Sequence, residues 1–259
     1  MPRDFSSIRP VLSQGRSMLS SFFDPVRLVR AFAAFPRYVA DWRKYSKFPG
    51  AEKIRVRDAY PCLHDRLRVT PMDSHYFYAN GWAIRRILKQ RPTTHVDIGS
   101  QAVFTNLLSA AIPVIFVDYR PLHASLPGLL CLSGDILKLP FRTASIPSVS
   151  CLHVAEHIGL GRYGDSLNPS GTYSACQELI RVLAPGGNLY FAVPIGAERV
   201  CFNAHRIHRL ETICRFFSPL DLVEISGVHD DGRFVEQVGK HEFDHSRYAC
   251  GFFWFRRPA

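Results

Sequence analysis

Short apolar runs alternate with segments of helical periodicity over most of the chain. The clearest run lies at 94–101, where Val96 and Ile98 lead into Gly99. Further runs of strand length lie at 113–117, 129–132, 147–153, 188–193, 221–228 and 248–255, and helical patterns lie at 81–88, 103–111, 172–183 and 205–217. This alternation predicts an α/β fold: a mostly parallel sheet of seven strands with helices on both faces. No helical pattern separates the last two runs, which favours an antiparallel final strand.

Residues 1–71 are predicted to be a basic N-terminal extension and linker, and residues 72–259 the α/β domain. Residues 1–21 are rich in Ser, Pro and Arg, which predicts loose order. Over 22–45 the apolar positions approximate one helical face, and Pro36 is expected to break or kink this pattern. Two interpretations stay open for this segment: a helix pair docked on the domain, or an interfacial helix on an anionic membrane.

The positive charge of the chain is concentrated in this extension. The formal net charge is +10, and residues 1–57 contain 12 Lys and Arg against 4 Asp and Glu. Phosphate-rich partners or an anionic membrane surface are therefore expected to meet the extension rather than the α/β domain. No module that combines aromatic and basic residues is visible, which argues against nucleic acid as the partner.

Seven cysteines are scattered through the sequence without any C-x-x-C pair. This spacing disfavours both a disulfide framework and a metal site and predicts reduced thiols. The first residues lack the apolar centre of a signal peptide, and no window is apolar over the ~18–20 residues that a membrane span needs. The sequence therefore predicts a cytoplasmic protein, with peripheral membrane contact as the alternative offered by residues 22–45.

Polar residues follow the predicted strands at the edge where α/β folds bind nucleotides. Gly99 permits a positive φ and a close ligand, whereas Asp97 lies inside its strand and needs a partner. Asp118 ends the second strand, where a carboxylate is placed to accept hydrogen bonds from ribose hydroxyls. After the third strand, Asp135 is expected to face an adenine amino group, with Ile136 packed on the ring.

A general base is expected at the end of the fourth strand, in the segment that contains His153 and His157. The aromatic stretch at 75–78 either lines an acceptor pocket or packs a helix against the sheet. His205, His208 and Glu211 have a spacing that invites a metal interpretation, which the scattered ligands elsewhere do not support.

Taken together, these motifs resemble class I S-adenosylmethionine-dependent methyltransferases over about residues 80–256. The segments VDIGS, GDILKLPF, HVAEHI and RVLAPGGNLYFAVP occur in that family's order, with the acidic Asp118 between the first two. More narrowly, the chain is similar to the DUF268 family in four strings: IGSQ, VDY, EHIGLGRYGD and FNAHRI. The resemblance implies a Rossmann-like methyltransferase sheet.

The resemblance also implies roles for individual residues and S-adenosyl-L-methionine as the cofactor. Asp97 and Gly99 would hold the first turn, Asp118 the ribose, Asp135 and Ile136 the adenine, and His153 would lie near the methionine moiety. Ordinary members have a G-x-G-x-G turn, whereas here Ser100, Gln101, Ala102 and Val103 follow Gly99. Either Ser100 and Gln101 contact the cofactor in another way, or the domain binds it weakly or not at all.

Three functions are compatible with these features. The first is methyl transfer to an acceptor such as a hydroxyl of a sugar or small molecule, with His157 or His205 as the base. The expected acceptor-binding residues are Arg162, Tyr163, Asp165, Asn203 and Arg206. The second is a catalytically inactive binding or scaffold protein that keeps the fold. The third is a nicotinamide-dependent oxidoreductase, against which the missing G-x-G-x-x-G argues.

Overall fold

The computed structural model describes residues 24–120 and 122–259, so the expectation for residues 1–21 lies outside the described part. Contacts divide the chain into two compact units, Met1–Pro71 and Met72–Ala259. The described part of the first unit contains the long helix α2 (Pro25–Tyr45) and the 3-10 turn η1 (Val56–Asp58). Its Asp24 side chain caps α2 by accepting from the backbone N–H groups of Val26 and Arg27.

Helix α2 runs through Pro36, so the expected break does not occur and one helix forms instead of a pair. Pro36 has no N–H to donate to the carbonyl of Phe32, which removes one hydrogen bond of the helix without ending it. Nine residues on the C-terminal side of Pro36 remain helical. The helical part of the prediction for 22–45 is therefore correct over the described residues, and the break expected at Pro36 is wrong.

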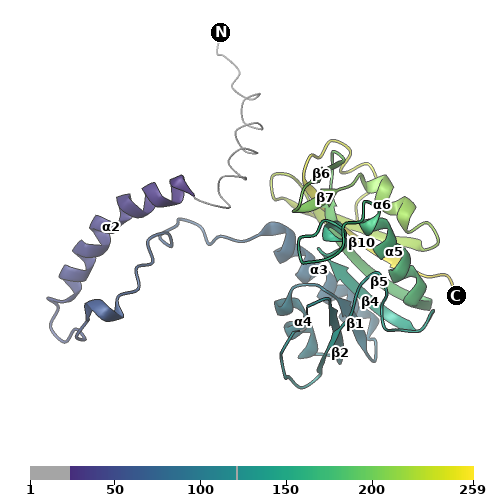
Figure 1. Ribbon diagram of the computed structural model, residues 1–259, viewed down its shortest axis with the longest axis horizontal. Helices are drawn as coiled ribbons and strands as arrows, with labels where there is room; N and C mark the ends of the chain where they lie inside the picture. Colours follow the sequence, from purple (N-terminus) through teal and green to yellow (C-terminus); the bar gives the residue numbers. More distant parts are fainter. Residues whose placement is uncertain (1–23, 121) are drawn as a thin grey trace, which may run out of the picture. The chain divides into compact units, whose positions relative to one another are not determined.

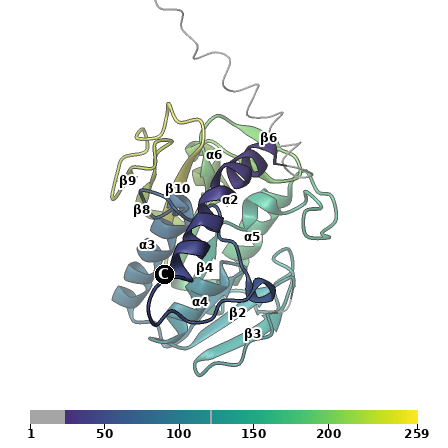
Figure 2. The same ribbon diagram turned by 90° about the vertical axis from the view of Figure 1, so that its left-hand side faces the viewer.

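The second unit is built on a sheet whose described strands lie in the order β3-β2-β1-β4-β5-β10-β8-β9 (Figures 1 and 2). The parallel part consists of β1 (His95–Ile98), β2 (Val114–Asp118), β3 (Leu129–Ser133), β4 (Ile146–Leu152) and β5 (Leu183–Ile195). Strand β10 (Ala249–Arg256) runs antiparallel between β5 and β8 (Asp221–Val228), and the short β9 (Phe234–Val235) adds an eighth strand at the edge. The predicted mostly parallel sheet with an antiparallel last strand is confirmed.

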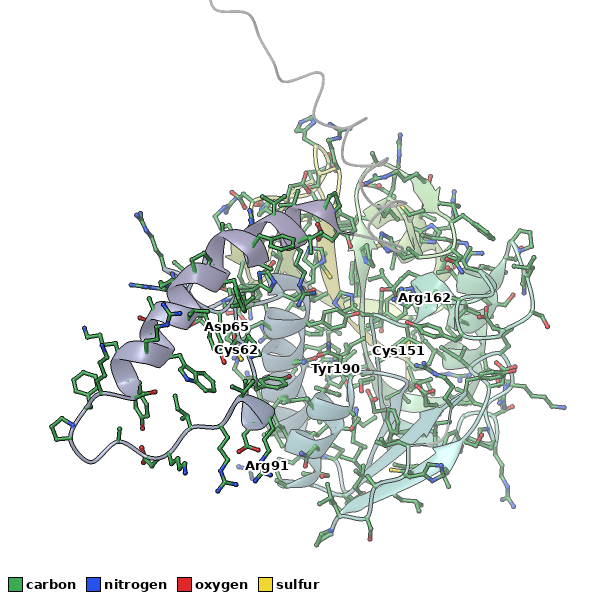
Figure 3. The ribbon with its side chains drawn as sticks, turned by 60° about the vertical axis from the view of Figure 1, so that its left-hand side comes forward. Cys62, Asp65, Arg91, Cys151, Arg162 and Tyr190 are labelled. Carbon is green, nitrogen blue, oxygen red and sulfur yellow. The ribbon has the colours of Figure 1, made fainter. Side chains whose placement is uncertain are left out.

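Helices cover both faces of this sheet. Helices α3 (Ser74–Gln90) and α4 (Ala102–Ser109) bury side chains such as Trp82 and Phe104 against one face. Helices α5 (Gly171–Val182) and α6 (Leu210–Phe216) bury Leu179 and Ile213 against the other. Adjacent strand residues alternate between the two cores, as Cys151 and Leu152 do, which explains why the strands read as nearly continuous apolar runs. Figure 3 labels Cys151 and Tyr190 in this interior.

The segment predicted as a helix at 205–217 divides into two elements. Strand β7 (His205–Ile207) pairs antiparallel with β6 (Arg199–Cys201) in a separate hairpin, and the helix begins only at Leu210. The helix prediction was wrong for residues 205–207. These residues pair with β6, which precedes them in the chain, and the spacing of apolar residues within the segment gives no signal of that pairing. The hairpin matters because it brings His205 and Arg206 to the edge where the site is found.

Candidate functional site

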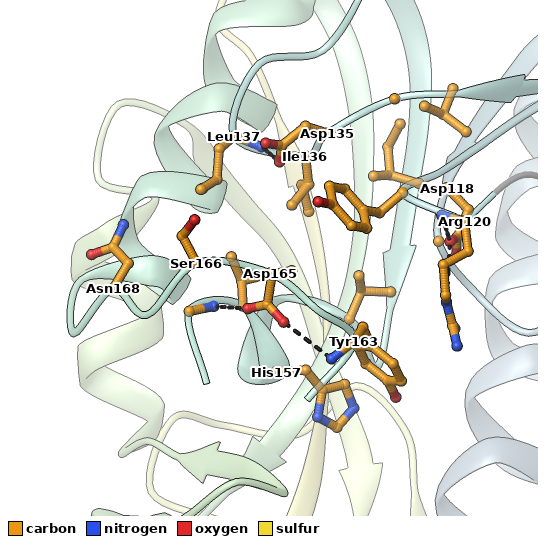
Figure 4. Close-up of a pocket in the computed structure, with 18 of the residues that line it drawn as sticks. Asp118, Arg120, Asp135, Ile136, Leu137, His157, Tyr163, Asp165, Ser166 and Asn168 are labelled. Atoms are coloured by element: carbon orange, nitrogen blue, oxygen red, sulfur yellow. Dashed lines mark hydrogen bonds and ion pairs between the residues drawn. The ribbon is translucent and has the colours of Figure 1, made fainter. Parts of the chain in front are cut away.

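A cavity of about 430 Å³ lies at the carboxyl ends of the parallel strands (Figure 4). Its walls come from the turn after β1, the loops after β2 and β3, and the segment 153–168 after β4. A second cavity of about 380 Å³ adjoins it and is lined by Tyr76, Ser100 and Gln101 among others. The two cavities share these lining residues: Gly99, Asp118, Arg120, His153 and Tyr163. Seven of the eight predicted cofactor residues line one or both, and the eighth, Asp97, is buried beneath them.

The turn after β1 depends on Gly99, which has a φ of +66°. A Cβ at this position would lie 3.1 Å from Cγ1 of Val154 and 3.5 Å from Oδ2 of Asp118. A larger residue would therefore be strained by its own backbone and would intrude between the two walls of the cavity. The absence of a side chain at position 99 keeps the space between Val154 and Asp118 open.

Asp97 supports this turn from below, since it is fully buried and lines neither cavity. Its carboxylate accepts from the backbone N–H of Ser100 at 3.1 Å, from the Ser100 hydroxyl at 2.7 Å and from the Ser150 hydroxyl. The Ser100 hydroxyl in turn accepts from the N–H of Leu152 at 3.0 Å. Burial raises the pKa of Asp97 to about 7 in spite of these donors. Asp97 and Ser100 thus tie β1 to β4, and the expected contact of Asp97 with a cofactor is indirect because Asp97 lines neither cavity.

A buried histidine continues this polar chain behind β1. His95 Nε2 lies 2.8 Å from the Ser150 hydroxyl oxygen, and Nδ1 lies 2.8 Å from that of Ser148. Burial lowers the pKa of His95 to about 3, so the ring is neutral. Because the Ser150 hydroxyl donates to Asp97, His95 must donate from Nε2 and accept at Nδ1. The expectation that Asp97 needs a partner is met by this chain of hydroxyl groups.

The residues that replace the usual glycines direct their side chains away from the larger cavity. Gln101 has φ −59° and ψ 135°, which any residue adopts, and its Oε1 accepts from Nδ2 of Asn80 on α3 at 3.2 Å. Val103 lies on α4 with 63% of its surface exposed. Only Gly99 in this turn needs a positive φ, so the missing glycines leave the larger cavity open.

Asp118 closes one side of the larger cavity. Its Oδ1 accepts from the backbone N–H of Arg120 at 2.7 Å, and its Oδ2 is directed toward Gly99. The Arg120 guanidinium lies 4.3 Å from the centre of the Tyr163 ring, a cation–π contact that joins the loop after β2 to the loop after β4. Asp135 accepts from the N–H of Leu137 at 2.8 Å, which shapes the turn that buries Ile136 in the cavity wall.

His153 follows β4 with a φ of +60° and is held by two buried groups. Its Nε2 lies 3.5 Å from the Cys250 sulfur, and its Nδ1 lies 3.4 Å from Oε1 of Glu156. Burial alone would lower the pKa of His153, but Cys250 and Glu156 outweigh burial and raise it to about 10. His153 therefore presents an imidazolium to both cavities, with the Tyr76 ring 4.5 Å from its own.

His157 also lines the larger cavity, whereas His205 does not. The Nδ1 of His157 lies 2.6 Å from the carbonyl oxygen of Ala204, a distance at which the nitrogen must carry the proton. Its Nε2 is therefore the basic nitrogen, 3.8 Å from Oε1 of Glu156. The His205 ring lies 6.4 Å from that of His157 and stacks on Tyr248 at 5.4 Å. Burial lowers the pKa of His205.

The predicted acceptor residues separate into cavity lining and support. Tyr163 and Asp165 line the cavity, and Asp165 shapes its loop by accepting from the N–H groups of Gly159 at 2.7 Å and Tyr163 at 3.1 Å. Arg206 donates to the carbonyl of Asn168 at 2.9 Å and to that of Ile158, so it holds the wall from outside. Arg162 donates to the carbonyl of Ala204 at 3.1 Å. Neither Arg162 nor Asn203 lines either cavity.

Two functional candidates were missing from the residues singled out in the sequence. Glu156 is 1% exposed, touches both site histidines, and its Oε2 has no hydrogen-bond partner among the described residues. The sequence could have indicated Glu156 by its position between His153 and His157. Arg120 was hidden because its partner Tyr163 lies 43 positions away. Among residues 24–120 and 122–259, no group of three or more His, Cys, Asp or Glu side chains is arranged to hold a metal ion.

Solved structures with the same architecture are methyltransferase folds. A chain of the complex that contains the Haloferax volcanii Trm112 methyltransferase activator matches with a TM-score of 0.52 and 16% identity, over 71% of this chain and 90% of the other. The N-methyltransferase NodS from Bradyrhizobium japonicum WM9, in complex with S-adenosyl-L-homocysteine, matches with 0.50 and 19% over 71% and 87%. The Burkholderia thailandensis 1,6-didemethyltoxoflavin-N1-methyltransferase, with bound S-adenosylhomocysteine, matches with 0.50 and 11% over 71% and 79%.

These similarities define the α/β unit as a Rossmann-like fold of the class I S-adenosylmethionine-dependent methyltransferase type. A model of the family described as "Caenorhabditis protein of unknown function, DUF268" matches residues 143–235. The resemblance to DUF268 is thereby confirmed over a segment that includes the strings at 156–165 and 202–207. No curated protein sequence matches the chain. At these identities the comparisons establish the fold, and the activity has to be argued from the site.

Proposed function

We propose that the protein is an S-adenosylmethionine-dependent methyltransferase. The observation that carries this proposal is the cavity of about 430 Å³ at the strand ends, bounded by Gly99, Asp118 and Ile136. In open α/β sheets, ligands bind at this edge. Two structural neighbours have S-adenosylhomocysteine bound, which supports the choice of cofactor.

The residues of the cavity fit the parts of this cofactor. Asp118 Oδ2 is directed into the gap beside Gly99, where a carboxylate accepts hydrogen bonds from two ribose hydroxyls. Ile136 offers a buried apolar surface for the adenine ring, and Asp135 lies beside it. The smaller cavity at Ser100 and Gln101 adjoins the turn and suits the methionine end. When bound, S-adenosylmethionine supplies a methyl group that it releases from its sulfonium sulfur.

We further propose that the acceptor presents a hydroxyl group, as a sugar or other small molecule does. His157 has its Nε2 free to take the hydroxyl proton, because Nδ1–H is committed to the carbonyl of Ala204. The carboxylate of Glu156, 3.8 Å from Nε2, stabilises the imidazolium that results. Tyr163 and the wall held by Asp165 and Arg206 enclose the acceptor side of the cavity.

A catalytically inactive binding protein is the second candidate. The observation in its favour is the replacement of two glycines of the family's turn by Gln101 and Val103. In that case the cavity would hold a small ligand without transferring a group from it. A nicotinamide cofactor lacks support, because the turn has no G-x-G-x-x-G and the sheet ends in antiparallel strands.

Calorimetric titration of the full chain separates these candidates. We expect S-adenosylmethionine and S-adenosylhomocysteine to bind, NAD not to bind, and Asp118→Ala to weaken the binding by about tenfold, as the loss of a charge-assisted hydrogen bond predicts. Asp135→Ala, measured in the same way, tests the adenine side of the cavity. If a folded sample binds neither S-adenosylmethionine nor S-adenosylhomocysteine, only the inactive candidate remains. Binding of NAD alone would contradict both candidates.

A further inference from the structure

Helix α2 presents an apolar surface that none of the described residues covers. None of its side chains falls in the buried class. Leu28, Phe32 and Phe35, spaced four and three apart, lie along one side of the helix and are 42%, 70% and 47% exposed. Val29 beside them is 67% exposed. Four large apolar side chains in one stretch are more than the scattered exposed residues of an ordinary surface. The apolar stripe is defined here as Leu28, Val29, Phe32 and Phe35.

Basic side chains lie mainly on the side of α2 opposite this apolar stripe. Arg30, Arg37 and Lys44 recur at every seventh residue and therefore form one row along the helix. Arg27 and Arg43 add two more positive charges, and Asp41 is the single acidic residue of α2, 4.0 Å from Arg37. Figure 3 draws the side chains of α2 as sticks around the helix. A basic polar face opposite an apolar stripe is typical of helices that lie in the plane of a membrane surface.

We propose that α2 binds peripherally to an anionic phospholipid surface. The apolar stripe would enter the boundary between head groups and acyl chains, and the positive charge of the polar face would attract the anionic surface. A second copy of the helix would also cover the stripe, but it would bring two strongly cationic helices together. Charge complementarity therefore favours lipid over self-association. This proposal is independent of the proposed methyl transfer.

The contact is peripheral. Over residues 24–120 and 122–259, no helix combines the length and the apolarity required to cross a membrane. Partly covered residues occur along the whole of α2, whereas the four side chains of the apolar stripe are all exposed. The partly covered residues are Val26, Ala31, Ala34, Tyr38, Val39 and Trp42. We therefore expect insertion into the membrane surface to begin at Leu28–Phe35. The attraction of the basic row to the anionic surface is the second contribution to binding.

The test is vesicle flotation with the full chain. We expect partition onto vesicles of phosphatidylcholine mixed with phosphatidylserine, little onto phosphatidylcholine alone, and loss of binding as salt rises. Phe32→Asp is expected to lower the partition coefficient on the order of tenfold. The double variant Arg30→Gln and Arg37→Gln is expected to lower it similarly and to flatten its salt dependence. Leu107→Asp, at a residue on α4 that is 59% exposed, is the matched control and is expected to keep binding.

Melting temperature and sedimentation are measured on the same samples. Unchanged partition of Phe32→Asp would overturn the proposal, and so would equal binding to both kinds of vesicle. A lower melting temperature of Phe32→Asp with unchanged partition would mean that the apolar stripe packs on the chain itself. Self-association that Phe32→Asp abolishes, without any vesicle binding, would assign the stripe to a second copy instead.

Discussion

Glu156 connects the two histidines that line the larger cavity. A single carboxylate lies 3.4 Å from His153 Nδ1 and 3.8 Å from His157 Nε2, and both rings are nearly buried. Because the pKa of His153 is raised, its imidazolium forms an ion pair with the Glu156 carboxylate. His157 has its Nε2 as the basic nitrogen, 3.8 Å from the same carboxylate, because its Nδ1 donates to the carbonyl of Ala204. The two histidines therefore differ in role although they differ little in sequence context.

Replacement of His157 should separate catalysis from cofactor binding. We expect His157→Gln to lower methyl transfer by about 100-fold or more, the contribution of a general base, with little change in the calorimetric affinity for S-adenosylhomocysteine. The assay follows labelled methyl transfer to any acceptor that the unmodified chain turns over. His205→Gln is the matched comparison and should retain most of the turnover. The reverse result would move the base to His205.

At the scale of the element, the strand–turn–helix unit β1–α4 decides whether the cavity is open. Gly99 supplies the single positive φ of the turn, and the Ser100 hydroxyl fastens it to β4. Gln101 then starts α4 with an ordinary backbone conformation. The unit therefore keeps its shape without the second and third glycines that related turns use.

A pair of alanine variants tests this account. Gly99 and Gly186 have φ values of +66° and +70°, but only at Gly99 would a Cβ meet Val154 and Asp118, since Gly186 has nothing within 4 Å. Each substitution should lower the free energy of unfolding by about 1–2 kcal/mol through backbone strain. Only Gly99→Ala should also weaken cofactor binding. Denaturant titration and calorimetry measure the two effects, and equal cofactor affinity in both variants would contradict the assignment of the turn.

For the whole α/β unit, buried titratable groups set the pH range of stability. His153 has its folded-state pKa raised to about 10, above the ordinary 6.5. The folded state therefore holds a proton that the unfolded state has released, and the resulting stabilisation is complete below pH 6.5 and is lost as pH rises toward 10. His95 and Asp97 change charge in the folded state near pH 3 and 7, so neither dominates the upper part of this window.

We therefore expect the free energy of unfolding to fall by up to about 1.4 kcal/mol per pH unit between pH 7 and pH 8, below the range in which the cysteines of the unfolded chain release their protons. Glu156→Gln should flatten this slope, because it removes the carboxylate that favours the charged His153. Glu224→Gln is the matched control: its carboxylate is also poorly exposed but pairs with Arg86, which keeps its charge over this range. Urea titrations at several pH values measure the slopes, and a slope that survives Glu156→Gln would refute the pairing.

The sequence by itself determined where most strands and helices lie along the chain and which polar residues follow most of the strands. The apolar runs at 94–101 and 113–117 are short, continuous and followed by Gly99 and Asp118, so local physics specifies both the strand and its polar end. Because parallel strands place their carboxyl ends at one edge, these residues could be expected to meet. The same local reasoning failed at Pro36 and at His205–Ile207, where an intact helix and a distant strand partner overrode the pattern.

Only the tertiary structure decided which polar residues face the cavity and which support it. Asp97, Arg206 and Asp165 look equally functional in the sequence. In the structure Asp97 accepts from Ser150 on β4 and Arg206 donates to carbonyl groups of the 158–168 wall, whereas Asp165 both lines the cavity and shapes its own loop. Glu156, Cys250 and Tyr163 gain their roles from contacts with His153 and Arg120 that span up to 97 positions. Such contacts depend on side-chain direction in the packed sheet, which no pattern along the chain encodes.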